Sequence, residues 1–178
     1  DTSPDFSLNG SVLFNTFTFI SVVILAPIFE ELIFRGIILN TLTKYNKMFA
    51  IIVTSLLFGL LHLNITQAIP AFFMSLVLCY MYVQTDSILV TILAHAGNNF
   101  LALMSAYSNH ILITVLVLAL VIYGLITIIL KSKEVNAFIK EEKTNENWYA
   151  RFFKQIPNLL YLIFTILWII ISLFMNMF

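Results

Sequence analysis

Long stretches without a charged residue constrain this fold more than any other feature. They run over residues 6–29, 48–85, 87–130 and 155–178. An α-helix needs about 20 predominantly apolar residues to cross the hydrocarbon core of a bilayer. Only 10% of the 178 residues are charged and 61% are hydrophobic, so too few charges remain to cover a water-facing surface. The sequence therefore predicts an all-α protein whose solvent is lipid.

Polar breaks divide the two longest stretches. One break, at residues 64–67, is followed by Pro70, which suits the first turn of a new helix, and the other lies at 107–110. We therefore expect a polytopic transmembrane helix bundle of about six spans, at residues 11–43, 48–64, 69–84, 87–106, 110–131 and 155–178. The first helix is longer than one span, and Pro27 is expected to kink it.

We expect residues 1–178 to form a single domain with its core motifs at about 20–110. Because the chain begins at Asp1 rather than at a methionine, we also expect it to be truncated at its N-terminus. The single cysteine, Cys79, excludes an internal disulfide and a cysteine-rich metal site. The formal net charge of zero gives no reason to expect a nucleic-acid partner.

The positions of lysine and arginine predict the orientation. They are concentrated in the turn at 44–47 and in the segment 131–154, whereas the turns near 64–70 and 107–110 have none. Basic loops remain cytoplasmic in most membrane proteins, and six spans would put both basic segments on one side. We therefore expect a multi-pass protein of the cell membrane with loops 44–47 and 131–154 in the cytoplasm. The 131–154 loop is expected to be solvated and partly helical.

Three charged residues lie inside the first predicted helix. Glu30, Glu31 and Arg35 follow 24 uncharged residues. A charge at the centre of a membrane helix costs about 2.5–3.5 kcal/mol on insertion scales, so three of them need a reason. Glu31 and Arg35 are four residues apart and can pair, while Glu30 lies about 100° further round the helix. A carboxylate there suits proton transfer in a reaction, although charges that snorkel to the cytoplasm are the alternative interpretation.

Two histidines and an asparagine are the other polar candidates. His62 shares a helix face with Phe58, and Glu30 and His62 are each 16 residues from residue 46, where a turn is expected. In an antiparallel hairpin, equal distances from the turn give equal depth. His95 and Asn99 share a face of the fourth predicted helix, also near mid-membrane.

Structural roles are the alternative for these residues. A lone histidine near a helix end and polar packing between helices are both common, and Gly97 would let a neighbouring helix approach closely. His110, in an outer turn, is expected to be exposed at the membrane interface.

Together these residue types suit the hydrolysis of an amide. A carboxylate beside a histidine can activate water, and a second histidine with an asparagine can donate hydrogen bonds to a developing oxyanion. A second version uses zinc held by Glu30, His62 and His95, although the usual H-E-x-x-H signature is absent. Composition and spacing leave both versions open.

Three segments carry a resemblance to a known family. The segment EELIFR at 30–35 resembles the E-E-x-x-x-R motif of the CAAX protease and bacteriocin-processing family, also called the abortive-infection family, which includes the type II CAAX prenyl endopeptidases. FGLLH at 58–62 resembles its F-x-x-x-H motif, and HAGNN at 95–99 its H-x-x-x-N motif. The three occur in the family's order, each on its own predicted helix.

The resemblance implies an intramembrane endopeptidase acting on membrane-associated peptides or proteins. Glu30 would activate water with His62, while His95 and Asn99 would form the oxyanion site. Glu31 and Arg35 would be a supporting pair, with Glu31 a candidate second catalytic carboxylate. Family members are often labelled metalloproteases, but the resemblance also fits a metal-free glutamate mechanism, which we favour over a divalent metal such as zinc. Bacterial members are linked to peptide maturation and bacteriocin self-immunity.

Two other functions remain open at this point. One is a non-catalytic membrane immunity or scaffold protein of the same family. The other is a proton-coupled transporter, since buried glutamate and histidine also serve as proton relays. The sequence shows no internal symmetry of paired halves, which the transporter would favour.

Overall fold

The computed structural model describes residues 11–107, 130–142 and 147–175, with isolated positions from 111 to 126. Among these residues there are helices and turns but no strand, which confirms the predicted all-α class. Most of the predicted helix at 110–131, and His110, lie outside the described residues.

The first helix is continuous from Val12 to Leu42 and contains two π-helical segments. Ser11 caps its start by accepting a hydrogen bond from the Phe14 amide. The consecutive elements are α1 (Val12–Phe19), η1 (Ile20–Leu25), α2 (Ala26–Glu31), η2 (Leu32–Leu39) and α3 (Asn40–Leu42). The predicted helix at 11–43 is therefore confirmed, and Pro27 is the second residue after a π segment.

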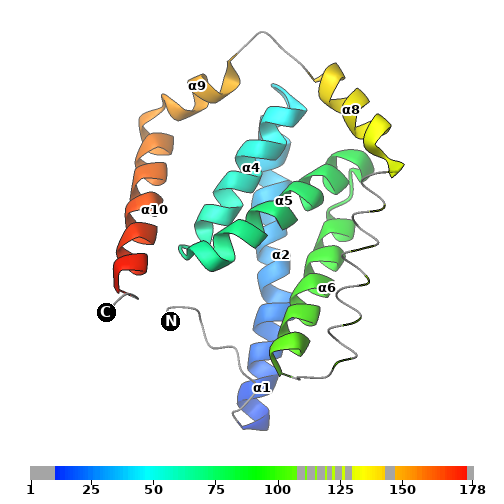
Figure 1. The fold of residues 1–178 in the computed structure, drawn as a ribbon, viewed down its shortest axis with the longest axis vertical. Coiled ribbons are helices and arrows are strands. Elements are labelled where there is room, and N and C mark those ends of the chain that lie inside the picture. Colours follow the sequence, from blue (N-terminus) through cyan, green and yellow to red (C-terminus); the bar gives the residue numbers. More distant parts are fainter. Residues whose placement is uncertain are drawn as a thin grey trace. The chain divides into compact units, whose positions relative to one another are not determined.

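A tight turn joins this helix to α4 (Lys47–Leu61) in an antiparallel hairpin (Figure 1). The Asn46 side chain caps α4 by accepting a 2.7 Å hydrogen bond from the Phe49 amide. Phe34 and Phe58 each lie 12 residues from Asn46, and their rings meet edge to face with centroids 5.0 Å apart. This contact confirms that the hairpin turns near Asn46, as the sequence predicted, while the facing of Glu30 and His62 remains a prediction.

Helix α5 (Ile65–Thr85) packs closely against α4. Leu63 has a positive φ of 53° in the turn between them, and the Asn64 side chain caps α5 by accepting from the Thr66 amide. A Cβ on Gly59 would lie 2.8 Å from the Ala68 carbonyl oxygen, so only glycine allows this approach.

The predicted boundaries at this turn were wrong. Helix α4 ends at Leu61 instead of residue 64, and α5 begins at residue 65 instead of 69, which places Pro70 inside the helix. The Asn64 side chain supplies a hydrogen-bond acceptor at the observed start of α5. Pro70 removes only one backbone donor, close to the N-terminal end of this helix.

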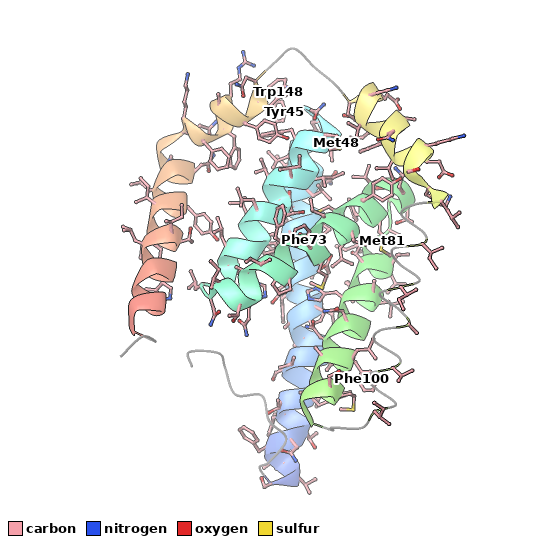
Figure 2. All side chains as sticks on the ribbon, viewed as in Figure 1. Tyr45, Met48, Phe73, Met81, Phe100 and Trp148 are labelled. Atoms are coloured by element: carbon pink, nitrogen blue, oxygen red, sulfur yellow. The ribbon has the colours of Figure 1, made fainter. Side chains whose placement is uncertain are left out.

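Aromatic side chains join α4 to α9 (Trp148–Phe153), which precedes α10 (Ile156–Met175). Tyr45 and Trp148 lie side by side with ring centroids 5.3 Å apart (Figure 2). Phe49 contacts the rings of Tyr149 and Phe152. With α8 (Ser132–Glu141), α9 makes the 131–154 segment partly helical, as predicted.

The chain divides into two compact units. One contains Glu30–Thr91 and Thr144–Phe178, and the other contains Asp5–Phe29 and Ile92–Lys143. In the second unit, the start of the first helix packs against α6 (Ile88–Tyr107), where the Phe19 and Phe100 rings meet edge to face at 6.2 Å.

Three helices of the described part are long and apolar enough to cross a membrane: Val12–Leu42, Ile65–Thr85 and Ile88–Ser105. Helix α4 is apolar but shorter. The protein is therefore a helical membrane protein. The six predicted spans and the single domain remain predictions.

Candidate active site

The first motif contains a fully buried ion pair. Arg35 Nη1 donates to Glu31 Oε1 at 2.9 Å, and neither side chain has any exposed surface. The four-residue spacing predicted this pairing, and the π-helical segment that follows Glu31 preserves it. A buried charge in a membrane helix requires such a partner, because no water is available to solvate it.

Two other helices complete the surroundings of Arg35. Its Nη2 donates to Ser75 Oγ at 2.8 Å and to the Ser75 carbonyl oxygen at 3.3 Å, both on α5. Its guanidinium carbon lies 5.0 Å from the centre of the Phe58 ring on α4, a cation–π distance. The planar guanidinium therefore ties the first, second and third helices of this unit together.

Sequence reasoning missed Ser75. A single serine in an apolar run has no partner at helical spacing that would distinguish it, and its charged partner lies 40 residues away. The Ser75 and Ser55 hydroxyl oxygens also lie 3.8 and 3.7 Å from Cys79 Sγ, and all three side chains are buried. Cys79 is thus a small buried side chain in a polar seam between α4 and α5.

His62 is the C-cap residue of α4, and its ring meets the Phe58 ring edge to face. The two ring centroids are 5.3 Å apart, and His62 Nδ1 lies 3.1 Å from the Phe58 carbonyl oxygen. Because a carbonyl oxygen can only accept, we assign the proton to Nδ1. This tautomer leaves Nε2 as the basic nitrogen, which suits either a general base or a metal ligand.

The first two motifs are therefore in direct contact. Arg35 of the first motif covers one ring, Phe58, on which His62 of the second motif also packs. Glu30 immediately precedes the buried Glu31 and is half-buried. Glu30, Glu31, Arg35 and His62 all belong to the same compact unit.

The third motif belongs to the other unit. His95 is buried, with 2% of its surface exposed. Asn99, four residues further along α6, donates from Nδ2 to the Val22 carbonyl oxygen at 3.0 Å. Among the described residues, no atom of another helix lies within 4 Å of a Cβ placed on Gly97, so the expected close approach there remains a prediction. A close approach of two helices is present at Gly59.

Among the described residues, no three histidine, cysteine, aspartate or glutamate side chains are grouped in a way that could hold a metal ion. The set Glu30, His62 and His95 is divided between the two units. The metal-dependent version therefore remains a prediction.

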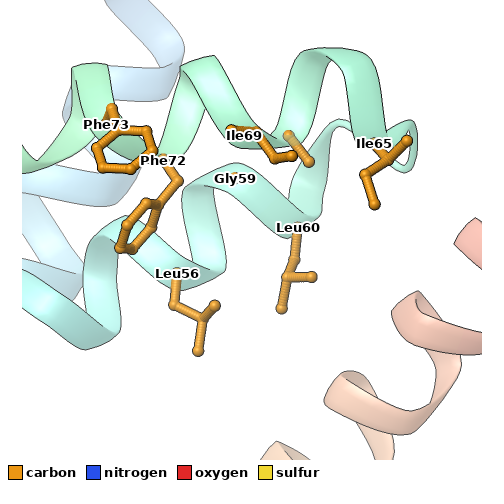
Figure 3. Close-up of a pocket in the computed structure, with 8 residues that line it drawn as sticks. Leu56, Gly59, Leu60, Ile65, Ile69, Phe72 and Phe73 are labelled. Atoms are coloured by element: carbon orange, nitrogen blue, oxygen red, sulfur yellow. The ribbon is translucent and has the colours of Figure 1, made fainter.

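An apolar pocket of about 260 Å³ lies between α4 and α5, within a turn of His62 (Figure 3). Only apolar side chains and backbone line it: Leu56, Gly59, Leu60, Ile65, Ala68, Ile69, Phe72 and Phe73. The pocket can accept hydrocarbon but offers no catalytic group of its own.

Comparison with known proteins gave two matches. The family model described as type II CAAX prenyl endopeptidase Rce1-like matches residues 12–101, which include all three motifs. A Bacillus subtilis (strain 168) protein named "Putative membrane peptidase YdiL" is 36% identical over 83 residues, which make up 46% of this chain and 34% of that protein. The match thus spans about a third of the relative's length. No solved structure matches the chain significantly.

Proposed function

This chain belongs to the type II CAAX prenyl endopeptidase Rce1-like family, and we propose that it is an intramembrane endopeptidase. Its substrates in this proposal are membrane-associated peptides or proteins. The observation that carries the proposal is the contact of Arg35 and His62 with the same Phe58 ring, because it joins two motifs beside a half-buried glutamate. Such ionisable groups within apolar helices mark functional sites.

In the proposed reaction, the Glu30 carboxylate takes a proton from water, and the oxygen of that water attacks the peptide carbonyl carbon. His62 holds the water through Nε2. One amide N–H of Asn99 and a ring N–H of His95 stabilise the oxyanion. Collapse of the intermediate breaks the C–N bond, and Glu30 returns its proton to the leaving amine.

Glu31 and Arg35 support this reaction by holding the catalytic residues in place. Their ion pair fixes the helical turn that carries Glu30, and Arg35 fixes the Phe58 ring beneath His62. We propose that the reaction is metal-free. In the zinc-dependent alternative, Glu30, His62 and His95 would hold the ion, which would supply Lewis acidity. Loss of activity on chelation, with recovery on adding zinc, would favour that alternative.

The proposal places the protein in the cell membrane with loops 44–47 and 131–154 in the cytoplasm. Their lysines and arginines support this orientation, since basic loops remain on the cytoplasmic side. The bilayer is then the partner of the apolar helices, and the substrate reaches the site from within it.

The test compares wild type with Glu30→Gln in the native host by mapping peptide termini in the membrane and secreted fractions. Loss of a general acid–base group should lower the amount of specific new termini by about 10²–10⁴-fold. Glu134→Gln is the matched control, because Glu134 is an exposed carboxylate paired only at the surface with Lys131. Identical termini in wild type and Glu30→Gln, at equal protein levels, would favour an immunity or scaffold protein.

A further inference from the structure

Pro27 is the second residue after the first π-helical segment, which ends at Leu25. The Ala26 amide donates to the Ser21 carbonyl, five residues back, and therefore not to Val22. In this register the Val22 carbonyl would receive its hydrogen bond from the amide of residue 27. Proline has no amide hydrogen. The helix itself therefore supplies no donor to the Val22 carbonyl.

Asn99 supplies that donor from α6, within the same compact unit. Its Nδ2 lies 3.0 Å from the Val22 oxygen, while its Oδ1 accepts a long hydrogen bond of 3.5 Å from Asn98 Nδ2. Because the carbonyl can only accept, the Asn99 amide has one allowed orientation here. A bare carbonyl in an apolar environment is costly, so this bond holds the side chain firmly.

We infer that Pro27 is a positioning residue for Asn99. By withholding a backbone donor, it leaves the Val22 carbonyl as the fixed acceptor for one amide hydrogen of Asn99. The second amide hydrogen then points in a set direction, as an oxyanion donor must. This role rests on the proposed function, in which Asn99 stabilises the oxyanion.

If Pro27 only shapes the helix, a different outcome is expected. A π turn also relieves the clash between a proline ring and the carbonyl four residues back. If that were the whole role of Pro27, replacing it would leave the Asn99 side chain and the reaction unaffected. The two interpretations therefore differ in how residues 27 and 99 depend on each other.

The first experiment is a double-mutant cycle on the full chain, unfolded by SDS titration in mixed micelles. Asn99→Ala should raise the unfolding equilibrium constant about tenfold, because it leaves a carbonyl bare. In a Pro27→Ala background the same change should have less than about a threefold effect, since a new backbone amide at position 27 reaches the Val22 oxygen. Pro70→Ala is the matched control, and in its background the tenfold effect should persist.

The second experiment measures cleavage. Pro27→Ala should fold at least as stably as wild type, yet lower the Glu30-dependent termini about tenfold, as expected for a misdirected oxyanion donor. With the peptide that those termini identify, kcat should fall while KM stays within about twofold. Pro70→Ala should leave both values unchanged.

Each outcome decides a different claim. An equal effect of Asn99→Ala in the wild-type and Pro27→Ala backgrounds would overturn the link between the residues. A coupled cycle with unchanged kcat would show that the link is structural and would overturn the positioning role. Absence of any Glu30-dependent termini would overturn the proposed function, and with it the catalytic meaning of a link that the cycle still detects.

Discussion

The two units satisfy the polar groups of their apolar helices in different ways. In the first, the Arg35 charge is met by side chains from three helices: the Glu31 carboxylate, the Phe58 ring and the Ser75 hydroxyl. In the second, the neutral Asn99 amide is met by one backbone carbonyl, that of Val22. The first arrangement depends on the identity of side chains, and the second depends on the path of a helix backbone.

This difference indicates which substitutions should destabilise each unit. Removing a partner of Arg35 leaves a full charge buried, whereas removing Asn99 leaves only a carbonyl dipole. Substitutions in the first unit should therefore disturb folding most. Substitutions around Asn99 should be milder for stability and should act on catalysis in the proposed function.

The largest effect is expected for Arg35→Met. It leaves the Glu31 carboxylate buried without its cation, which should cost about 3–5 kcal/mol of unfolding free energy. SDS titration in mixed micelles measures this value. The double change Glu31→Gln with Arg35→Met should recover part of the loss.

Arg151→Met is the control, since Arg151 is exposed over Trp148 and should contribute less than about 1 kcal/mol. Similar losses for Arg35→Met and Arg151→Met would remove the contrast between buried and exposed cations.

A smaller effect is expected for Ser75→Ala. Arg35 Nη2 keeps the Ser75 carbonyl but loses the hydroxyl, which should cost about 1–3 kcal/mol. Ser55→Ala is the matched control, because its hydroxyl bonds only weakly to Cys79 sulfur. The same titration compares the two variants. A loss at Ser55 equal to that at Ser75 would mean that general packing, and not the Arg35 charge, sets the cost.

The last prediction compares two glycines, one in each unit, and the smallest effect of the series is expected at Gly97. Gly59→Ala places a Cβ 2.8 Å from the Ala68 oxygen and should cost about 1–3 kcal/mol by forcing α4 and α5 apart. Gly97→Ala meets open space in the described part of the chain and should leave stability unchanged or slightly raised. A destabilising Gly97→Ala would instead indicate a neighbour at that helix face.

Much of the first unit could be predicted from the sequence because its pattern is local. The i,i+4 spacing gave the Glu31–Arg35 pair and the shared face of Phe58 and His62, and both are present in the structure. The hairpin turn predicted near Asn46 is also confirmed by the Phe34–Phe58 contact. The catalytic roles of these residues remain predictions.

The remainder could not be predicted because it depends on contacts distant in sequence and on backbone register. Ser75 meets its partner across 40 residues, and nothing in its own helix marks it. The π turn before Pro27 has no hydrophobic signature, so the sequence does not reveal that the Val22 carbonyl lacks a donor from its own helix. The break placed before Pro70 was wrong because the proline was weighted above the Asn64 cap.

The three-helix environment of Arg35 also has a consequence for how the chain is made. Arg35 leaves the ribosome 40 residues before Ser75 and 23 before Phe58. Until those residues are inserted, the Arg35 cation in the first helix has only the Glu31 carboxylate as a partner. An ion pair of this kind is poorly solvated by lipid. Release of the first helix into the bilayer by itself is therefore unfavourable. Biogenesis should retain the nascent helices at the insertion machinery until the third can enter with them.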